Sequence, residues 1–180
     1  MKKLLIFSTL YLIFQLLNAQ PEDKKLGKIT FHMVDGEYED AASKAEKLRE
    51  DAEYRKNGWV YYYMSQAYFE IAGMPELQED YPKAFKESLK AAYKLEKYKA
   101  KPEENIDVWN NAQEFLSILK DSAITVSEIY YDNEDYRKAA YYLKSITRFA
   151  PDDYGVWLMK GVYEIKSRNV GEGIKSIIIR

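Results

Sequence analysis

Apolar and small residues recur at helical spacing along much of this chain, most regularly from residue 123 to residue 157. The first half of that stretch places one helical face at Ala123, Val126, Ser127 and Tyr130. A polar break at 132–135 follows, and a second helical face falls at Tyr136, Ala139, Leu143 and Ile146. Pro151 then ends the pattern, because proline lacks an N–H and holds φ fixed. The pattern predicts two antiparallel helices joined by a tight turn.

The same kinds of residue return 34 positions later. Adding 34 to Ala123, Ser127, Ala139 and Leu143 gives, in order, Trp157, Gly161, Gly173 and Ile177. A small residue therefore recurs where two helices would cross closely, and an aliphatic residue recurs at the last position. This pattern resembles the tetratricopeptide repeat, a helix-turn-helix unit of about 34 residues. The resemblance implies an all-α fold, a right-handed α-solenoid of antiparallel helix pairs.

Weaker copies of the pattern flank the clear one, and we expect four repeats, at about 21–56, 58–98, 103–151 and 154–180. The helical faces of the second copy fall at Tyr61, Met64, Ser65 and Tyr68 and at Tyr81, Ala84, Ser88 and Ala91. Seven extra residues separate these two faces, within 73–80, and their role stays open. The stretch 103–131 has no helix breaker, which predicts an extended helix or two nearly collinear helices.

The N-terminus has the features of a secretory signal. A positively charged start, Met1-Lys2-Lys3, precedes an apolar run at 4–17, and Ala19 supplies a small residue before a cleavage site. The run is shorter than the roughly 20 residues that span a bilayer, so a permanent anchor is the weaker alternative. We expect 1–19 to be a cleavable signal peptide, although its exact cleavage site stays open, and 20–180 to be the repeat domain. The mature protein would be periplasmic or secreted, with no stable membrane span.

Composition argues against catalysis and against nucleic-acid binding. The chain has no cysteine, which excludes a thiolate nucleophile, a disulfide and a zinc–thiolate site. Its only histidine is His32, for which we expect a structural role because no second histidine or thiol exists to work with it. Removal of 1–19 takes away two of 27 basic residues, which leaves 25 against 29 acidic ones, a charge of −4. We expect no enzymatic activity, cofactor, metal site or nucleic-acid partner.

The resemblance also implies a binding surface, because the first helices of successive repeats in such proteins line a concave groove. Carried over position by position, the groove residues are Trp59, Tyr62, Gln66 and Phe69, then Ile124, Glu128 and Tyr131, then Leu158, Val162 and Ile165. This set is largely aromatic and aliphatic and contains none of the basic residues with which chaperone-binding members hold a terminal carboxylate. We expect a protein-protein interaction scaffold of the cell envelope that binds another protein or a peptide segment.

Two alternatives stay open from the sequence. A Trp- and Tyr-rich face at Trp59, Tyr62, Tyr63 and Phe69 would also suit a small molecule or glycan. Three adjacent isoleucines, 177–179, close the fourth copy without a polar capping helix. This apolar end suggests cover by a partner, by a second copy of the chain as a homo-oligomer, or by further chain. In the last case the sequence would be the N-terminal interaction module of a larger envelope protein.

Overall fold

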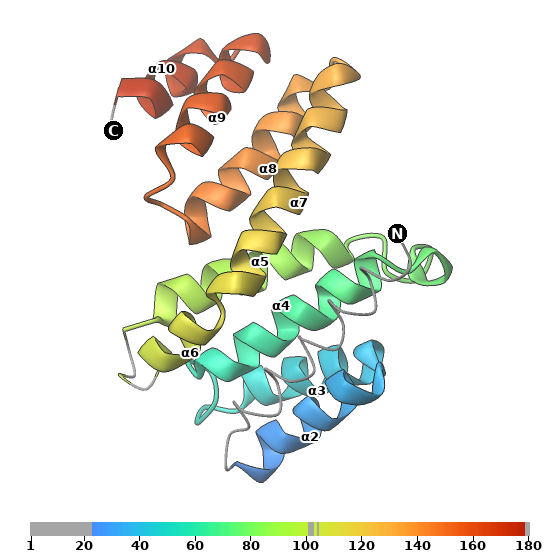
Figure 1. Ribbon diagram of the computed structural model, residues 1–180. Helices are drawn as coiled ribbons and strands as arrows, with labels where there is room; N and C mark the ends of the chain where they lie inside the picture. Colours follow the sequence, from blue (N-terminus) through green and yellow to red (C-terminus); the bar gives the residue numbers. More distant parts are fainter. Residues whose placement is uncertain (1–22, 101–102, 104, 179–180) are drawn as a thin grey trace. The chain divides into compact units, whose positions relative to one another are not determined.

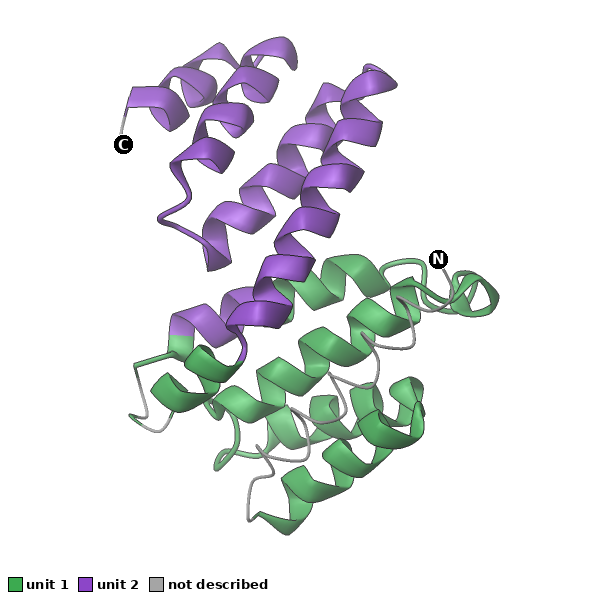
Figure 2. Cartoon of the chain, in the orientation of Figure 1, with its two compact units in different colours: residues 1–91, 98–111 green, residues 92–97, 112–180 purple. Residues whose placement is uncertain are grey.

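A computed structural model describes residues 23–100, 103 and 105–178. Within this part of the chain there are nine α-helices, one 3₁₀ turn and no strand, which confirms the all-α class (Figure 1). The expected signal peptide, 1–19, lies outside the described residues. The described residues form two compact units (Figure 2): unit 1 comprises those within 1–91 and 98–111, and unit 2 comprises those within 92–97 and 112–180.

Each unit is a set of short antiparallel helices. The elements of unit 1 are α2 (Lys24–Asp35), α3 (Tyr38–Glu50), α4 (Gly58–Ala72), the 3₁₀ turn η1 (Pro75–Leu77), most of α5 (Ala84–Tyr98) and α6 (Asn105–Asn111). Those of unit 2 are α7 (Gln113–Asp132), α8 (Tyr136–Phe149), α9 (Tyr154–Lys166) and α10 (Val170–Ile178), with residues 92–97 of α5. Polar side chains fix where several helices begin, since Asp23, Asn57, Asp135 and Asp153 accept hydrogen bonds from the first backbone N–H groups of α2, α4, α8 and α9.

The core of unit 1 is built around α4. This helix carries apolar residues on all sides, and a helix with that composition is normally buried all round. It packs against α2, α3 and α6, and α2, α3 and α4 lie side by side in Figure 1. Val60, Tyr63 and Ile71 are completely buried, and the Tyr63 hydroxyl accepts a hydrogen bond of 3.0 Å from Thr30 on α2.

A single buried amide joins three segments of unit 1. Asn105 Oδ1 accepts from the backbone N–H of Gly58 at 2.7 Å, and Asn105 Nδ2 donates to the carbonyls of Lys56 and Tyr98 at 2.7 and 2.8 Å. A Cβ at position 58 would lie 2.9 Å from Asn105 Oδ1, so a larger residue there would displace this amide from its hydrogen bonds. The stretch 103–131 is not one extended helix, because its described residues form two helices, α6 and α7, with a break at Ala112.

Unit 2 contains the same turn geometry twice, at equivalent positions of the two successive helix pairs. The shared backbone hydrogen bonds run from Glu134 N to Tyr131 O and Asp135 N to Tyr130 O, and from Arg168 N to Ile165 O and Asn169 N to Glu164 O. Glu134 and Arg168 have φ values of 59° and 65°, and they are the only non-glycine residues with positive φ in the described chain. The repetition found in the side-chain pattern is therefore present in the backbone as well.

Small residues mark the helix crossings in both units. Ser127 Oγ donates to the carbonyl of Ala139 at 2.8 Å, and at the equivalent crossing of the next helix pair a Cβ on Gly161 would lie 2.8 Å from the carbonyl oxygen of Gly173. In unit 1, Ser65 Oγ donates to the carbonyl of Ser88 at 2.9 Å.

These contacts correct the register predicted for the second helix of the second repeat. In the second repeat, Ser88 is at the position equivalent to Ala139 of the third repeat, whereas the sequence pattern had assigned Ala84 to that position. The separation from Ser65 to Ser88 is 23 residues and that from Ser127 to Ala139 is 12, so the insertion is longer than predicted. Tyr81 and the residues after it have helical spacing in the sequence, but α5 begins only at Ala84.

Candidate functional site

The positions predicted to line a groove on α4 are largely inside unit 1. Tyr62 and Gln66 are 7% and 3% exposed, while Trp59 and Phe69 are half-buried. The Trp59 ring stacks on Tyr63 with centroids 5.6 Å apart. A side chain buried in this way cannot contact a partner without rearrangement, so Tyr62 and Gln66 are not part of the accessible surface. The resemblance placed them outside, but the all-round apolar character of α4 draws them in.

The same burial argues against an aromatic platform for glycans. Tyr63 is 0% exposed and Tyr62 is nearly so, which leaves neither ring face open for stacking on a ligand. Among the four residues of that alternative, only Trp59 and Phe69 keep partial access to solvent.

In unit 2 the predicted positions are far more accessible. On α7, Glu128 is exposed, and Ile124 and Tyr131 are half-buried. On α9, Leu158, Val162 and Ile165 are 54%, 40% and 38% exposed. The Tyr131 ring stacks on Tyr163 of α9 with centroids 4.3 Å apart, so these two first helices are neighbours.

The accessible apolar residues of α9 continue onto α10. On α9, Tyr154 is 61% exposed and begins a row that includes Leu158, Val162 and Ile165; on α10 a row of exposed residues runs along Val170, Ile174, Ile177 and Ile178. Both rows follow helical spacing. They meet because Ile177 lies against Gly161 of α9 and Ile165 lies against Gly173 of α10. We call these eight residues the C-terminal apolar surface.

The start of α9, and hence of this surface, is held by Asp153. Its Oδ1 accepts from the backbone N–H of Val156 at 3.1 Å, and its Oδ2 accepts from the Lys120 ammonium of α7 at 2.8 Å. Lys120 is the main cause of the lowered pKa of Asp153, so the carboxylate stays ionised under ordinary conditions.

A buried ionic group links α9 to α10, and sequence reasoning missed it. The Lys160 ammonium lies 2.9 Å from Glu164 Oε1 and donates to Ser176 Oγ at 2.6 Å, while Ser176 Oγ donates to Glu164 Oε2 at 2.8 Å. Lys160 and Glu164 are only 6% and 8% exposed. The available signal was a Lys and a Glu four residues apart on an otherwise apolar helical face.

His32 is joined to its surroundings across the turn between α2 and α3. Its Nδ1 lies 2.5 Å from Glu37 Oε2, and one ligand atom each of His32, Glu37 and Asp40 lie within 4.8 Å of one another. One imidazole and two carboxylates suit a divalent transition metal by donor type. Both carboxylate residues are exposed, and the His32–Glu37 contact also serves to fix the turn.

Two further observations bear on function. The chain matches no protein-family model, no curated protein and no solved structure. Of the helices that the structure describes, none has the combination of length and apolar character needed to cross a membrane.

Proposed function

We propose that this protein is an exported helical-repeat scaffold of the tetratricopeptide type, which binds a segment of another protein through the C-terminal apolar surface. The observation that carries the proposal is the pair of exposed apolar rows on α9 and α10, which meet at Ile165 and Ile177. A continuous apolar patch on a folded protein commonly marks an interaction site.

The partner segment that fits this surface best is an amphipathic helix. Within unit 2, α7 packs on α8, α8 on α9 and α9 on α10, so each helix is covered by the next. The exposed row on α10 has the spacing of a helix that receives one more neighbour. A partner helix with residues at i, i+3 or i+4 and i+7 would continue the same packing, and each Å² of apolar area buried would contribute roughly 25 cal/mol before the costs of association.

Membership of the tetratricopeptide class is supported by the backbone of unit 2. The turn that joins α7 to α8 and the turn that joins α9 to α10 use the same hydrogen bonds. The small-residue crossing at Ser127 and Ala139 recurs 34 residues later, at Gly161 and Gly173. A spacing of 34 residues is the length of a tetratricopeptide repeat. Export to the periplasm or beyond, and a role in an envelope assembly, rest on the signal-like segment at 1–19 and are proposed with it.

Photocrosslinking in intact producing cells tests the proposal. A photoreactive residue at Leu158 samples the surface, and one at Lys138 on α8 is the control, since 60% of its side chain is accessible. We expect one envelope protein to be captured from position 158 and not from position 138. Equal capture from both positions, or none from position 158, would contradict the proposed surface. A crosslinked product of twice the chain mass would show that a second copy of this chain, and not another protein, occupies the surface.

A further inference from the structure

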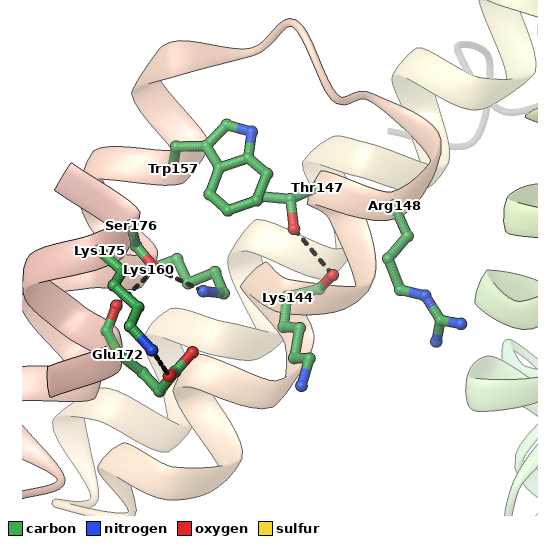
Figure 3. A pocket seen from close by; sticks show the side chains of 8 residues that line it. All are labelled: Lys144, Thr147, Arg148, Trp157, Lys160, Glu172, Lys175 and Ser176. Carbon is green, nitrogen blue, oxygen red and sulfur yellow. Dashed lines mark hydrogen bonds and ion pairs between the residues drawn. The ribbon is translucent and has the colours of Figure 1, made fainter. Parts of the chain in front are cut away.

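Unit 2 contains a cavity of about 590 Å³ between α8, α9 and α10, and it shares no residue with the C-terminal apolar surface. Figure 3 shows the Trp157 ring above Lys160, with Lys144 on one side and the Lys175–Glu172 pair on the other. Arg148 lies at the outer edge in this view. A cavity of this size is within the range that holds small organic ligands.

The charges that line the cavity do not cancel. Lys175 pairs with Glu172 at 2.8 Å, and Lys160 pairs with Glu164 behind the wall. Lys144 and Arg148, four residues apart on α8, form no ion pair within the described residues of the chain. The Arg148 guanidinium instead lies 3.9 Å from the centroid of the Tyr93 ring and, as its hydrogen-bond partner, lowers the pKa of the Tyr93 hydroxyl. The lining therefore has a net positive charge from Lys144, which also acts on Glu172 through its charge, and from Arg148.

The apolar part of the cavity is a fixed aromatic wall. Trp157 Nε1 donates to the carbonyl of Pro151 at 2.9 Å, which holds the indole in place. The Lys160 ammonium lies 5.1 Å from the centroid of the Trp157 ring and is itself held by Ser176 and Glu164. The cavity thus combines a rigid ring and a buried, oriented cation with the accessible ammonium of Lys144.

We propose that this cavity binds an organic oxyanion, a carboxylate or phosphate carried on a flat apolar group. The apolar group packs against Trp157, and the oxyanion accepts a hydrogen bond from Lys144, with Arg148 adding positive potential at the edge. The carrier is either a free small molecule or the last residue of a peptide. This site is separate from the proposed partner surface and does not depend on it.

Isothermal titration of the purified protein with phenyl phosphate tests the site. We expect saturable binding with one ligand per chain, binding at least tenfold weaker with inorganic phosphate, and none with phenol or benzylamine. If inorganic phosphate binds as tightly as phenyl phosphate, the aromatic ring of the ligand does not pack on Trp157. If the cation benzylamine binds, the cavity does not select for negative charge, and the proposal is wrong. A peptide that ends in Phe, with a free or an amidated terminus, distinguishes the two carriers: binding of the free form alone indicates a peptide end. If neither the peptide nor phenyl phosphate binds, the proposal is wrong.

Paired variants on α8 locate the binding. Lys144→Gln should weaken phenyl phosphate binding about tenfold, which corresponds to the loss of one hydrogen bond to a charged group. Lys138→Gln, an exposed lysine of the same helix outside the cavity, should leave it unchanged. Raising the salt from about 50 to about 500 mM should weaken binding to the wild type and have less effect on Lys144→Gln. An equal loss in the two variants would mean non-specific attraction to a basic surface and would overturn the site.

Discussion

At the residue scale, close helix packing in unit 2 depends on single small side chains. Gly161 and Gly173 bring α9 and α10 so near that a Cβ on either would lie under 3 Å from the other's carbonyl oxygen. In the preceding helix pair, Ser127 makes the same approach to Ala139 and adds a hydrogen bond. These positions were predictable from the sequence, because a small residue recurs at each of them in both copies of the pattern.

The tight crossing predicts opposite effects for two alanine substitutions. Gly161→Ala should lower the free energy of unfolding by about 1–2 kcal/mol, because the new methyl group meets a backbone carbonyl that cannot move aside. Gly171→Ala is the matched control on the same helix pair, with no atom within 4 Å of its Cβ. It should be neutral or stabilise by up to about 1 kcal/mol. Urea unfolding of both variants checks this, and a stabilising Gly161→Ala would show that the helices are not in close contact.

Buried tyrosine predicts alkaline destabilisation. Burial raises the pKa of Tyr63 to about 12, against about 10 in an unfolded chain. Between these two values the unfolded chain loses this proton more readily than the folded one, so the free energy of unfolding falls as pH rises. Tyr63→Phe should show a shallower fall between pH 10 and 12 than the wild type, measured by unfolding at several pH values. Tyr154→Phe, at an exposed position, should keep the wild-type slope; equal slopes in all three proteins would contradict the assignment.

At the element scale, the pairing of α9 with α10 combines an apolar rim with a buried ionic centre. The centre was not predicted, because the sequence pattern marks Glu164 only as a departure from the tyrosine at the matching position, Tyr130. Its partner Ser176 comes from another helix, 12 residues away, and their contact depends on the crossing geometry. A Lys and a Glu four residues apart are neighbours on a helix, but that spacing does not predict that both are buried.

For the buried ionic group of Lys160, Glu164 and Ser176, we predict that two substitutions have non-additive effects on the free energy of unfolding. Lys160→Met should cost about 3 kcal/mol of unfolding free energy, because it leaves the Glu164 carboxylate buried without its cation. The double variant with Glu164→Leu should recover most of this loss, since the Ser176 hydroxyl can then donate its one proton to the carbonyl of Glu172 instead of to Glu164. A double-mutant cycle by urea unfolding measures the coupling, and additive effects would mean that the two charges are solvated.

The helix α4 shows where a family resemblance can mislead. Its spacing matches a first helix of a repeat, and the resemblance assigned Tyr62 and Gln66 to an open groove. The composition of α4 favoured the opposite result, because a helix that is apolar on every side leaves no face for solvent. On α9 the polar residues Lys160 and Glu164 are the buried ones, whereas Leu158, Val162 and Ile165 are accessible; that these three line a groove stays a prediction.

At the scale of the whole molecule, the sequence predicted the helical class and most of the turns but not the two compact units. The turns were visible because polar residues and proline interrupt helical spacing, as at 132–135 and at Pro151. The break between α6 and α7 falls at Ala112, a good helix former that is fully buried. No local signal marks it, so tertiary packing alone decides where the helix stops.

The whole-molecule account also separates folding from binding at the C-terminal apolar surface. Leu158→Ala should change the free energy of unfolding by less than about 0.5 kcal/mol, because more than half of the side chain is accessible. Ile146→Ala, at a completely buried position of α8, should cost about 2–5 kcal/mol. Similar losses in both variants, measured by urea unfolding, would make Leu158 a core residue and remove it from the binding surface.

The most direct test of the proposed function is the affinity of the purified Leu158→Ala variant for the partner captured from position 158. If the surface binds an amphipathic helix, the dissociation constant should rise at least about fivefold, the effect of losing roughly 1 kcal/mol at one apolar anchor. The control Lys138→Ala should bind as the wild type does. An unchanged dissociation constant for Leu158→Ala would contradict the account, because the partner would then bind elsewhere on the molecule.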